Sequence, residues 1–324
     1  MLVLKDLSAE VPDTNAYHWR LEEYSEDDST SALLYGYHSY KNKENHRAME
    51  EHTRKIMFNN WMPCEFAQYS DSGFDALHYD EMFSEVYTIC PHSAKWLNDI
   101  RGDEKYKTIF YPFHEDLVPE PQKKIYDVIY HGGIHGNEHV ECLETISQFK
   151  YQYITMTRHI NELTMRCLGY ATTGNLPFKD KIGVIAKSKI SVCYNMVHNQ
   201  PLHTESIKKY PNWGGNVAFS EVDAWDIMPQ FKTRMHEAAM SRTLNLVQRD
   251  PWNMAEYYYQ PETEFIYFDD KNDLKDKIHE ISTNWHQYEA IVERAFKRSL
   301  DYTVRKFIAF IESGHEWKGV SNEL

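Results

Sequence analysis

The chain has 324 residues, 42% hydrophobic and 14% aromatic, enough for two α/β domains of about 150 residues each. Its net charge of −14 argues against binding to a nucleic-acid backbone, and no stretch reaches the roughly 20 apolar residues of a membrane span. We also expect no signal peptide, because the N-terminal residues lack a basic region and a long apolar segment. The five cysteines are scattered without a CxxC pair, which favours reduced thiols in a cytoplasm over a structural zinc site.

Strand and helix patterns alternate through the first 115 residues. The predicted strands cover 32–35, 55–61, 85–91 and 105–113, and the predicted helices cover 42–54, 74–85 and 92–102. This alternation is typical of an open, mostly parallel sheet. Residues 115–124 then read as a linker, because Pro119 and Pro121 interrupt both helices and strand ladders.

The alternation starts again after the linker. Strands are predicted at 126–130, 151–156, 189–196, 243–248 and 264–268, and helices from residue 138, at 181–188 and at 228–241. A long amphipathic helical segment is predicted from about Asp273 to Glu312, with a last helix around Leu300 to Ile311. The chain therefore reads as two α/β halves followed by helices.

The sequence DVIYHGGIHGN, residues 127–137, places a glycine turn between a strand and a helix. This order builds phosphate sites in doubly wound sheets, because glycine lets the backbone approach a ligand and the next helix offers unpaired N–H groups. Gly132 and Gly133 are the candidate residues, with His131 or His135 as possible positive partners. The spacing is not GxGxxG, and three glutamates in the following helix would repel an anion that they faced. A tight turn without a ligand stays open.

A second group of residues lies in FKTRMHEAAMSRTLNLV, residues 231–247, which the apolar strand EFIYF follows at 264–268. Here the chain resembles the glycosyltransferases of the GT-B fold, in the branch whose C-terminal half carries a TRxxEA-like helix before an apolar strand. The matching residues are Thr233, Arg234 and Glu237. The resemblance covers about residues 125–300, and the N-terminal half matches only in its α/β rhythm.

The resemblance implies two Rossmann-like domains that face each other across a cleft. Residues 1–120 would form the acceptor-side domain and 121–299 the nucleotide-sugar-binding domain, and a C-terminal helix within about 300–324 would cross back onto the first domain. The implied activity is metal-independent transfer of a sugar from a nucleotide-sugar donor, most simply a UDP or GDP sugar, to a saccharide or other hydroxyl acceptor. Neither a cofactor nor a bound metal is implied.

The residue types suit this chemistry. Glu237 could accept the ribose hydroxyls, and Arg234, three residues earlier on the same helix face, could reach the diphosphate and neutralise the leaving group. Thr233 could add a hydroxyl, and Lys187 is a secondary candidate for the nucleotide. The alternative for Arg234 and Glu237 is a surface ion pair on an amphipathic helix, and Glu237 is expected to face solvent in both interpretations.

The catalytic base is open between two candidates at the rim of the N-terminal half. His38 follows the first strand and Glu65 follows the second, and either could deprotonate an acceptor hydroxyl if the reaction inverts the anomeric centre. Two departures from the family favour a different class of protein. A second glutamate is expected eight positions before Glu237, where this chain has Pro229, and an arginine is often present near the start of the helix after the glycine loop, where this chain is acidic. A non-catalytic nucleotide-sugar or carbohydrate-binding protein of the same fold is therefore the alternative. An NAD-dependent oxidoreductase is disfavoured, because the glycine loop opens the second half of the chain.

Overall fold

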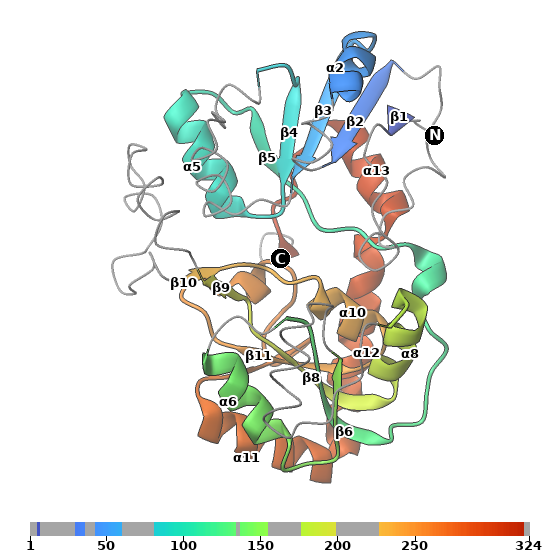
Figure 1. The fold of residues 1–324 in the computed structure, drawn as a ribbon, viewed down its shortest axis with the longest axis vertical. Coiled ribbons are helices and arrows are strands. Elements are labelled where there is room, and N and C mark those ends of the chain that lie inside the picture. The colour runs from blue at the N-terminus through green and yellow to red at the C-terminus, as the bar shows by residue number, and fades with distance from the viewer. Residues whose placement is uncertain are drawn as a thin grey trace.

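The computed structural model describes residues 5–6, 30–35, 43–59, 81–133, 137–154, 176–198 and 227–320. Within these ranges the chain forms two lobes, each with its own five-stranded parallel sheet (Figure 1). The predictions at His38, Glu65 and His135, and most of the predicted helix 74–85, lie outside the described residues.

The first lobe carries its strands in chain order, β1-β2-β3-β4-β5. They are β1 (Lys5–Asp6), β2 (Ser31–Tyr35), β3 (Arg54–Asn59), β4 (Glu85–Thr88) and β5 (Tyr106–Thr108), with helices α2 (Lys43–Glu50) and α5 (Pro91–Arg101) between them. Local sequence sets the ends of α5. Pro91 occupies the first turn, the Cys90 side chain accepts a hydrogen bond from the Ser93 N–H, and Gly102 ends the helix at a φ of +76°.

The second lobe has the strand order β12-β11-β8-β6-β7. Its strands are β6 (Tyr126–His131), β7 (Tyr151–Ile154), β8 (Ser188–Cys193), β11 (Leu244–Gln248) and β12 (Ile266–Phe268). The chain leaves β6 for β7 on one side and returns to β8 on the other. The sheet therefore has a topological switch point between β6 and β8, and ligands of doubly wound sheets bind at the carboxyl ends of the strands there.

Helices cover both faces of this second sheet. They are α6 (Asn137–Ile146), α8 (Phe178–Ala186), α10 (Arg234–Met240), α11 (Lys271–Thr283) and α12 (Trp285–Ser299). Side chains alternate along a strand, so Val128 and Tyr130 of β6 pack in the cluster that includes α6 and α11, while Ile129 packs in the cluster that includes α8 and α10. The same alternation places His131 on the α8 and α10 face.

One predicted helix begins later in the structure than expected. The segment predicted as a helix at 228–241 begins as a strand, β10 (Ile227–Pro229), which pairs antiparallel with β9 (Met196–His198). Asn195 keeps the next residues extended, because its backbone and side-chain oxygens accept hydrogen bonds from the N–H groups of Gln230 and Lys232. α10 starts only at Arg234.

The amphipathic helical segment predicted from Asp273 to Glu312 consists of three helices. Asn284 has non-helical dihedral angles between α11 and α12, and Thr303 is extended (φ −78°, ψ 157°) before α13 (Val304–Ser313). Thr303 also forms a bridge with Phe113 of the first lobe, so the break lies where the chain passes between lobes. Among the described helices, none is long and apolar enough to cross a bilayer.

The predicted return of the C-terminal helix onto the first lobe is confirmed. α13 lies beside the first sheet (Figure 1), and Phe307 packs on Phe58 with ring centroids 4.9 Å apart. Arg54 Nη2 donates to the carbonyl of Ile311 at 2.6 Å, and Lys107 Nζ donates to the carbonyl of Gly314 at 2.7 Å. These cations meet the negative end of the helix dipole and the carbonyls of its last turn.

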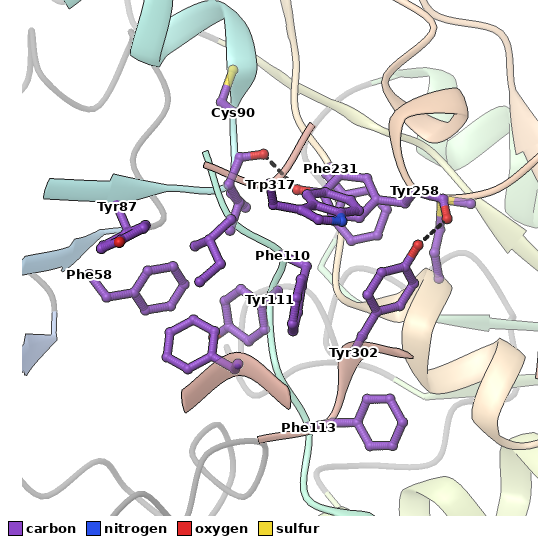
Figure 2. Close-up of a cluster of buried hydrophobic side chains, with 14 of the residues drawn as sticks. Phe58, Tyr87, Cys90, Phe110, Tyr111, Phe113, Phe231, Tyr258, Tyr302 and Trp317 are labelled. Atoms are coloured by element: carbon purple, nitrogen blue, oxygen red, sulfur yellow. Dashed lines mark hydrogen bonds between the residues drawn. The ribbon is translucent and has the colours of Figure 1, made fainter. Parts of the chain in front are cut away.

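An aromatic cluster joins the two lobes (Figure 2). Phe231 and Tyr258 of the second lobe stack at 3.7 Å, and the Tyr258 hydroxyl donates to the carbonyl of Ile89 in the first lobe at 2.6 Å. Trp317, beyond α13, packs 5.0 Å from Tyr258, and its backbone N–H donates to Thr108 of β5. One buried core therefore runs from the first sheet to the loop that precedes α10.

Candidate functional site

At the switch point of the second sheet, β6 is followed by Gly132, and a side chain at that position would displace Arg234. Gly132 follows β6 with a φ of +145°, a conformation that side chains rarely adopt. A Cβ atom at Gly132 would lie 2.4 Å from Nη2 of Arg234. The absence of a side chain at Gly132 therefore creates the space that the Arg234 guanidinium occupies.

Arg234 is the first residue of α10 and stands against this glycine. Its guanidinium lies over the ring of Tyr130, 5.1 Å from the centroid. Nη1 is buried and makes no hydrogen bond, and none of the described carboxylates forms an ion pair with Arg234. A guanidinium keeps its charge in proteins, and a buried donor without a partner is costly. The arrangement therefore fits an anion that would approach the carboxyl end of β6.

Glu237, one helical turn after Arg234, is buried, with only 4% of its surface exposed. Lys181 Nζ lies 2.8 Å from its Oε1 and 2.7 Å from its Oε2, and His131 Nδ1 lies 3.0 Å from Oε2. The prediction of a solvent-facing carboxylate is therefore wrong. The α10 face that carries Glu237 packs on α8 and β6, and the carboxylate is held there by a lysine and a histidine.

His131 continues this network into the sheet. Burial lowers the pKa of His131 to about 4, and the positive charges of Lys181 and Arg234 act in the same direction, against the Glu237 carboxylate. The ring is therefore neutral near pH 7, and His131 does not supply the positive charge that the sequence analysis allowed it at the glycine turn. Nδ1 of His131 lies 3.0 Å from Oε2 of Glu237, and Nε2 forms a hydrogen bond with the Ser191 hydroxyl at 2.9 Å.

The connectivity Ser191–His131–Glu237 is that of a nucleophilic triad, but the site cannot act as one. Ser191 lies within β8 and has no exposed surface. A nucleophile has to reach its substrate, so these contacts hold the ring of His131 in place at the end of β6 and do not form a nucleophilic site. Among the residues that the structure describes, no group of three His, Cys, Asp or Glu side chains is arranged to hold a metal ion.

The remaining predicted site residues separate into two places. Thr233 directly precedes α10, half-buried, and its hydroxyl does not cap the helix. Gly133 follows Gly132, and its carbonyl accepts from the Tyr130 hydroxyl at 2.9 Å. Lys187 lies at the opposite edge of the sheet, because its carbonyl accepts from Tyr126 at the start of β6, about 20 Å of strand away from Gly132. The structure therefore does not bring Lys187 to the site.

Lys181 is the site residue that the sequence interpretation missed. The residues of α8 that face the core are Phe178, Lys181, Ile182, Ile185 and Ala186. A lysine among apolar residues at helical spacing is unusual, because a buried charge needs a partner. That position on the apolar face was a detectable signal for a buried ion pair.

Comparison with known proteins agrees with this geometry. A family described as glycosyl transferase-like matches residues 152–313, which include α8, β8, α10 and β11. The chain belongs to this family. No curated protein matches the sequence.

Solved glycosyltransferases share the fold of this family member at low identity. TarM from S. aureus, in complex with fondaparinux, α-GlcNAc-glycerol and UDP, gives a TM-score of 0.56 at 10% identity over 89% of this chain and 56% of its own. HepE from Anabaena, in complex with UDP and glucose, gives 0.57 at 14% identity over 87% and 78%. Sucrose-phosphate synthase from Thermosynechococcus elongatus gives 0.56 at 11% identity over 92% and 74%. The chain thus spans only about half the length of TarM. At such low sequence identity, the structural similarity shows a shared GT-B fold and no more.

Proposed function

We propose that this glycosyl transferase-like protein moves a sugar from a nucleoside-diphosphate sugar to an acceptor hydroxyl. The observation that carries the proposal is the guanidinium of Arg234, charged and without a carboxylate partner, beside Gly132 at the switch point of a doubly wound sheet. A diphosphate offers the paired oxygens that a guanidinium binds in a fork. UDP bound to HepE and to TarM supports UDP as the first nucleotide to test.

Arg234 would act on the leaving group. The acceptor oxygen forms a bond to the anomeric carbon of the sugar, the bond from that carbon to the diphosphate oxygen breaks, and the diphosphate leaves with the electron pair. A fixed positive charge at the diphosphate stabilises this departure without the need for a divalent metal. His38 and Glu65 remain the proposed acceptors of the hydroxyl proton, and Gly133 and Thr233 the proposed backbone and hydroxyl neighbours of the nucleotide.

Glu237 is proposed to contact the ribose, with less capacity than the sequence alone indicated. A carboxylate offers about four acceptor positions. Lys181 and His131 already make three contacts with the two oxygens of Glu237. The carboxylate therefore has less acceptor capacity for the ribose hydroxyls than an unengaged carboxylate would have.

The reducing cytoplasm is the proposed compartment, because the described cysteines Cys90, Cys142 and Cys193 are free thiols in the core. The acidic net charge of −14 supports the proposal that nucleic acid is not a partner. A saccharide is the proposed acceptor class.

A thermal-shift screen of UDP, GDP and ADP sugars in the presence of a chelator, followed by calorimetry, tests the binding site. Arg234→Met should weaken UDP binding about 10- to 100-fold, as expected for a charge-assisted contact worth about 1.5–3 kcal/mol. Arg305→Met is the matched control, because the Arg305 side chain is 79% exposed on α13. Unchanged UDP affinity in Arg234→Met would remove the site.

The non-catalytic alternative requires a separate measurement. Purified protein with each nucleotide sugar that binds is assayed for release of nucleoside diphosphate, with and without saccharide acceptors. Turnover that falls in Arg234→Met supports a transferase. Saturable binding without turnover, with the full panel of acceptors, would assign a binding protein of the same fold.

A further inference from the structure

The side chains around Arg234 form one buried electrostatic cluster. Arg234 and Lys181 each carry one positive charge, Glu237 carries one negative charge, and His131 is neutral near pH 7 because burial holds its pKa at about 4. The cluster therefore carries one surplus positive charge. That surplus resides on Arg234, because the lysine and the carboxylate contact each other.

The pairing inside the cluster is not the one that local sequence favours. Arg234 and Glu237 are three residues apart on α10, at the spacing of a helical ion pair. Glu237 is paired instead with Lys181 of α8, which lies within 3 Å of both carboxylate oxygens. Burial opposes the charge of Arg234, but the nearby Glu237 is among the groups that raise the pKa of Arg234, so the two side chains interact electrostatically.

We propose that Lys181 is a positioning residue for anion binding: by neutralising Glu237, it prevents that carboxylate from pairing with Arg234 and leaves the guanidinium for a diphosphate. This inference rests on the proposed role of Arg234. Lys181 itself is 7% exposed and is engaged by both oxygens of Glu237, so it acts on the ligand through the carboxylate. The chemistry that it selects is a phosphate or diphosphate group on the Arg234 side of the cluster.

Two single variants and their combination test the mechanism with inorganic pyrophosphate, which has no ribose and so does not report on a Glu237–ribose contact. Lys181→Met should bind pyrophosphate about 5- to 100-fold more weakly than the natural protein, the usual range of coupling between sites. Lys181→Met/Glu237→Gln should recover affinity to within about threefold, since the released carboxylate is then absent. Glu237→Gln alone should bind pyrophosphate more tightly, because it leaves two positive charges.

Lys179→Met is the matched control, because Lys179 is exposed on the same helix. Loss of affinity that the double variant does not restore would overturn the inference, because it would mean that Lys181 touches the anion or only supports the fold. Unchanged affinity in Glu237→Gln would also overturn it, and this variant keeps the test valid if Lys181→Met does not fold. Failure of the proposed function is distinguishable, since Arg234→Met would then leave pyrophosphate affinity unchanged.

Discussion

Gly132→Ala tests whether the absence of a side chain at Gly132 makes room for the guanidinium of Arg234. The new Cβ would lie 2.4 Å from Nη2 and 2.8 Å from Cζ of Arg234, closer than atoms of folded proteins approach. The guanidinium would have to leave the end of β6. Alanine would also have to adopt a φ of +145°, which costs about 1–3 kcal/mol.

Two other glycines provide the scale for this substitution. Gly102 has a φ of +76° and Gly183 is helical, and a Cβ at either would meet nothing within 4 Å. Gly183→Ala should stabilise the protein by about 0.5–1 kcal/mol, and Gly102→Ala should destabilise it by about 1–2 kcal/mol through φ alone. Gly132→Ala should cost more than Gly102→Ala, about 2–4 kcal/mol, because it adds the displacement of Arg234 to the φ term.

The assay is urea unfolding of each variant together with calorimetry of UDP binding. Gly132→Ala should lose at least about tenfold in UDP affinity. Gly102→Ala and Gly183→Ala should not change it. In an Arg234→Ala background, the stability cost of Gly132→Ala should shrink towards the φ term. Equal costs in both backgrounds, or full UDP affinity in Gly132→Ala, would refute the argument that Gly132 makes room for Arg234.

Three further predictions concern buried groups at and near the lobe junction. Burial raises the pKa of Asp250 from 3.8 to about 6, so ionisation disfavours the folded state and the unfolding free energy should fall as pH rises through that window, by up to about 3 kcal/mol; Asp250→Asn should remove this slope in unfolding titrations at several pH values. Burial lowers the pKa of His92 from 6.5 to about 4, so the stability that depends on a neutral His92 should be lost as pH falls through that range. His92→Phe should therefore make the unfolding free energy less dependent on pH at the acid end of the same titration, and an unchanged pH dependence there contradicts the assignment. Tyr258→Phe leaves the carbonyl of Ile89 without its donor and should cost about 1–3 kcal/mol, with a loss below 0.5 kcal/mol counting against a shared core between the lobes.

Sequence alone determined the elements whose signal is local. Alternating apolar runs and helical spacing predicted β2 to β5 of the first sheet and all five strands of the second, but not β1 (Lys5–Asp6). The order of strand, glycine turn and helix predicted where the second lobe would present its backbone. The family resemblance, carried by Thr233, Arg234 and Glu237, predicted the GT-B fold and the return of the C-terminal helix. These features follow from neighbouring residues or from a motif, so they can be predicted without the tertiary contacts.

Only the tertiary structure decided how the charges are paired. The spacing of Arg234 and Glu237 on one helix indicated a pair with each other, but burial of that helix face brings Lys181 from α8 and His131 from β6 to the carboxylate. Lys187 and Lys181 lie six residues apart, yet the crossover sends one to the amino edge of the sheet and the other to the site. A buried charge pairs with the group that the packing of several elements brings next to it. The separation of those residues in the sequence does not predict which groups will pair.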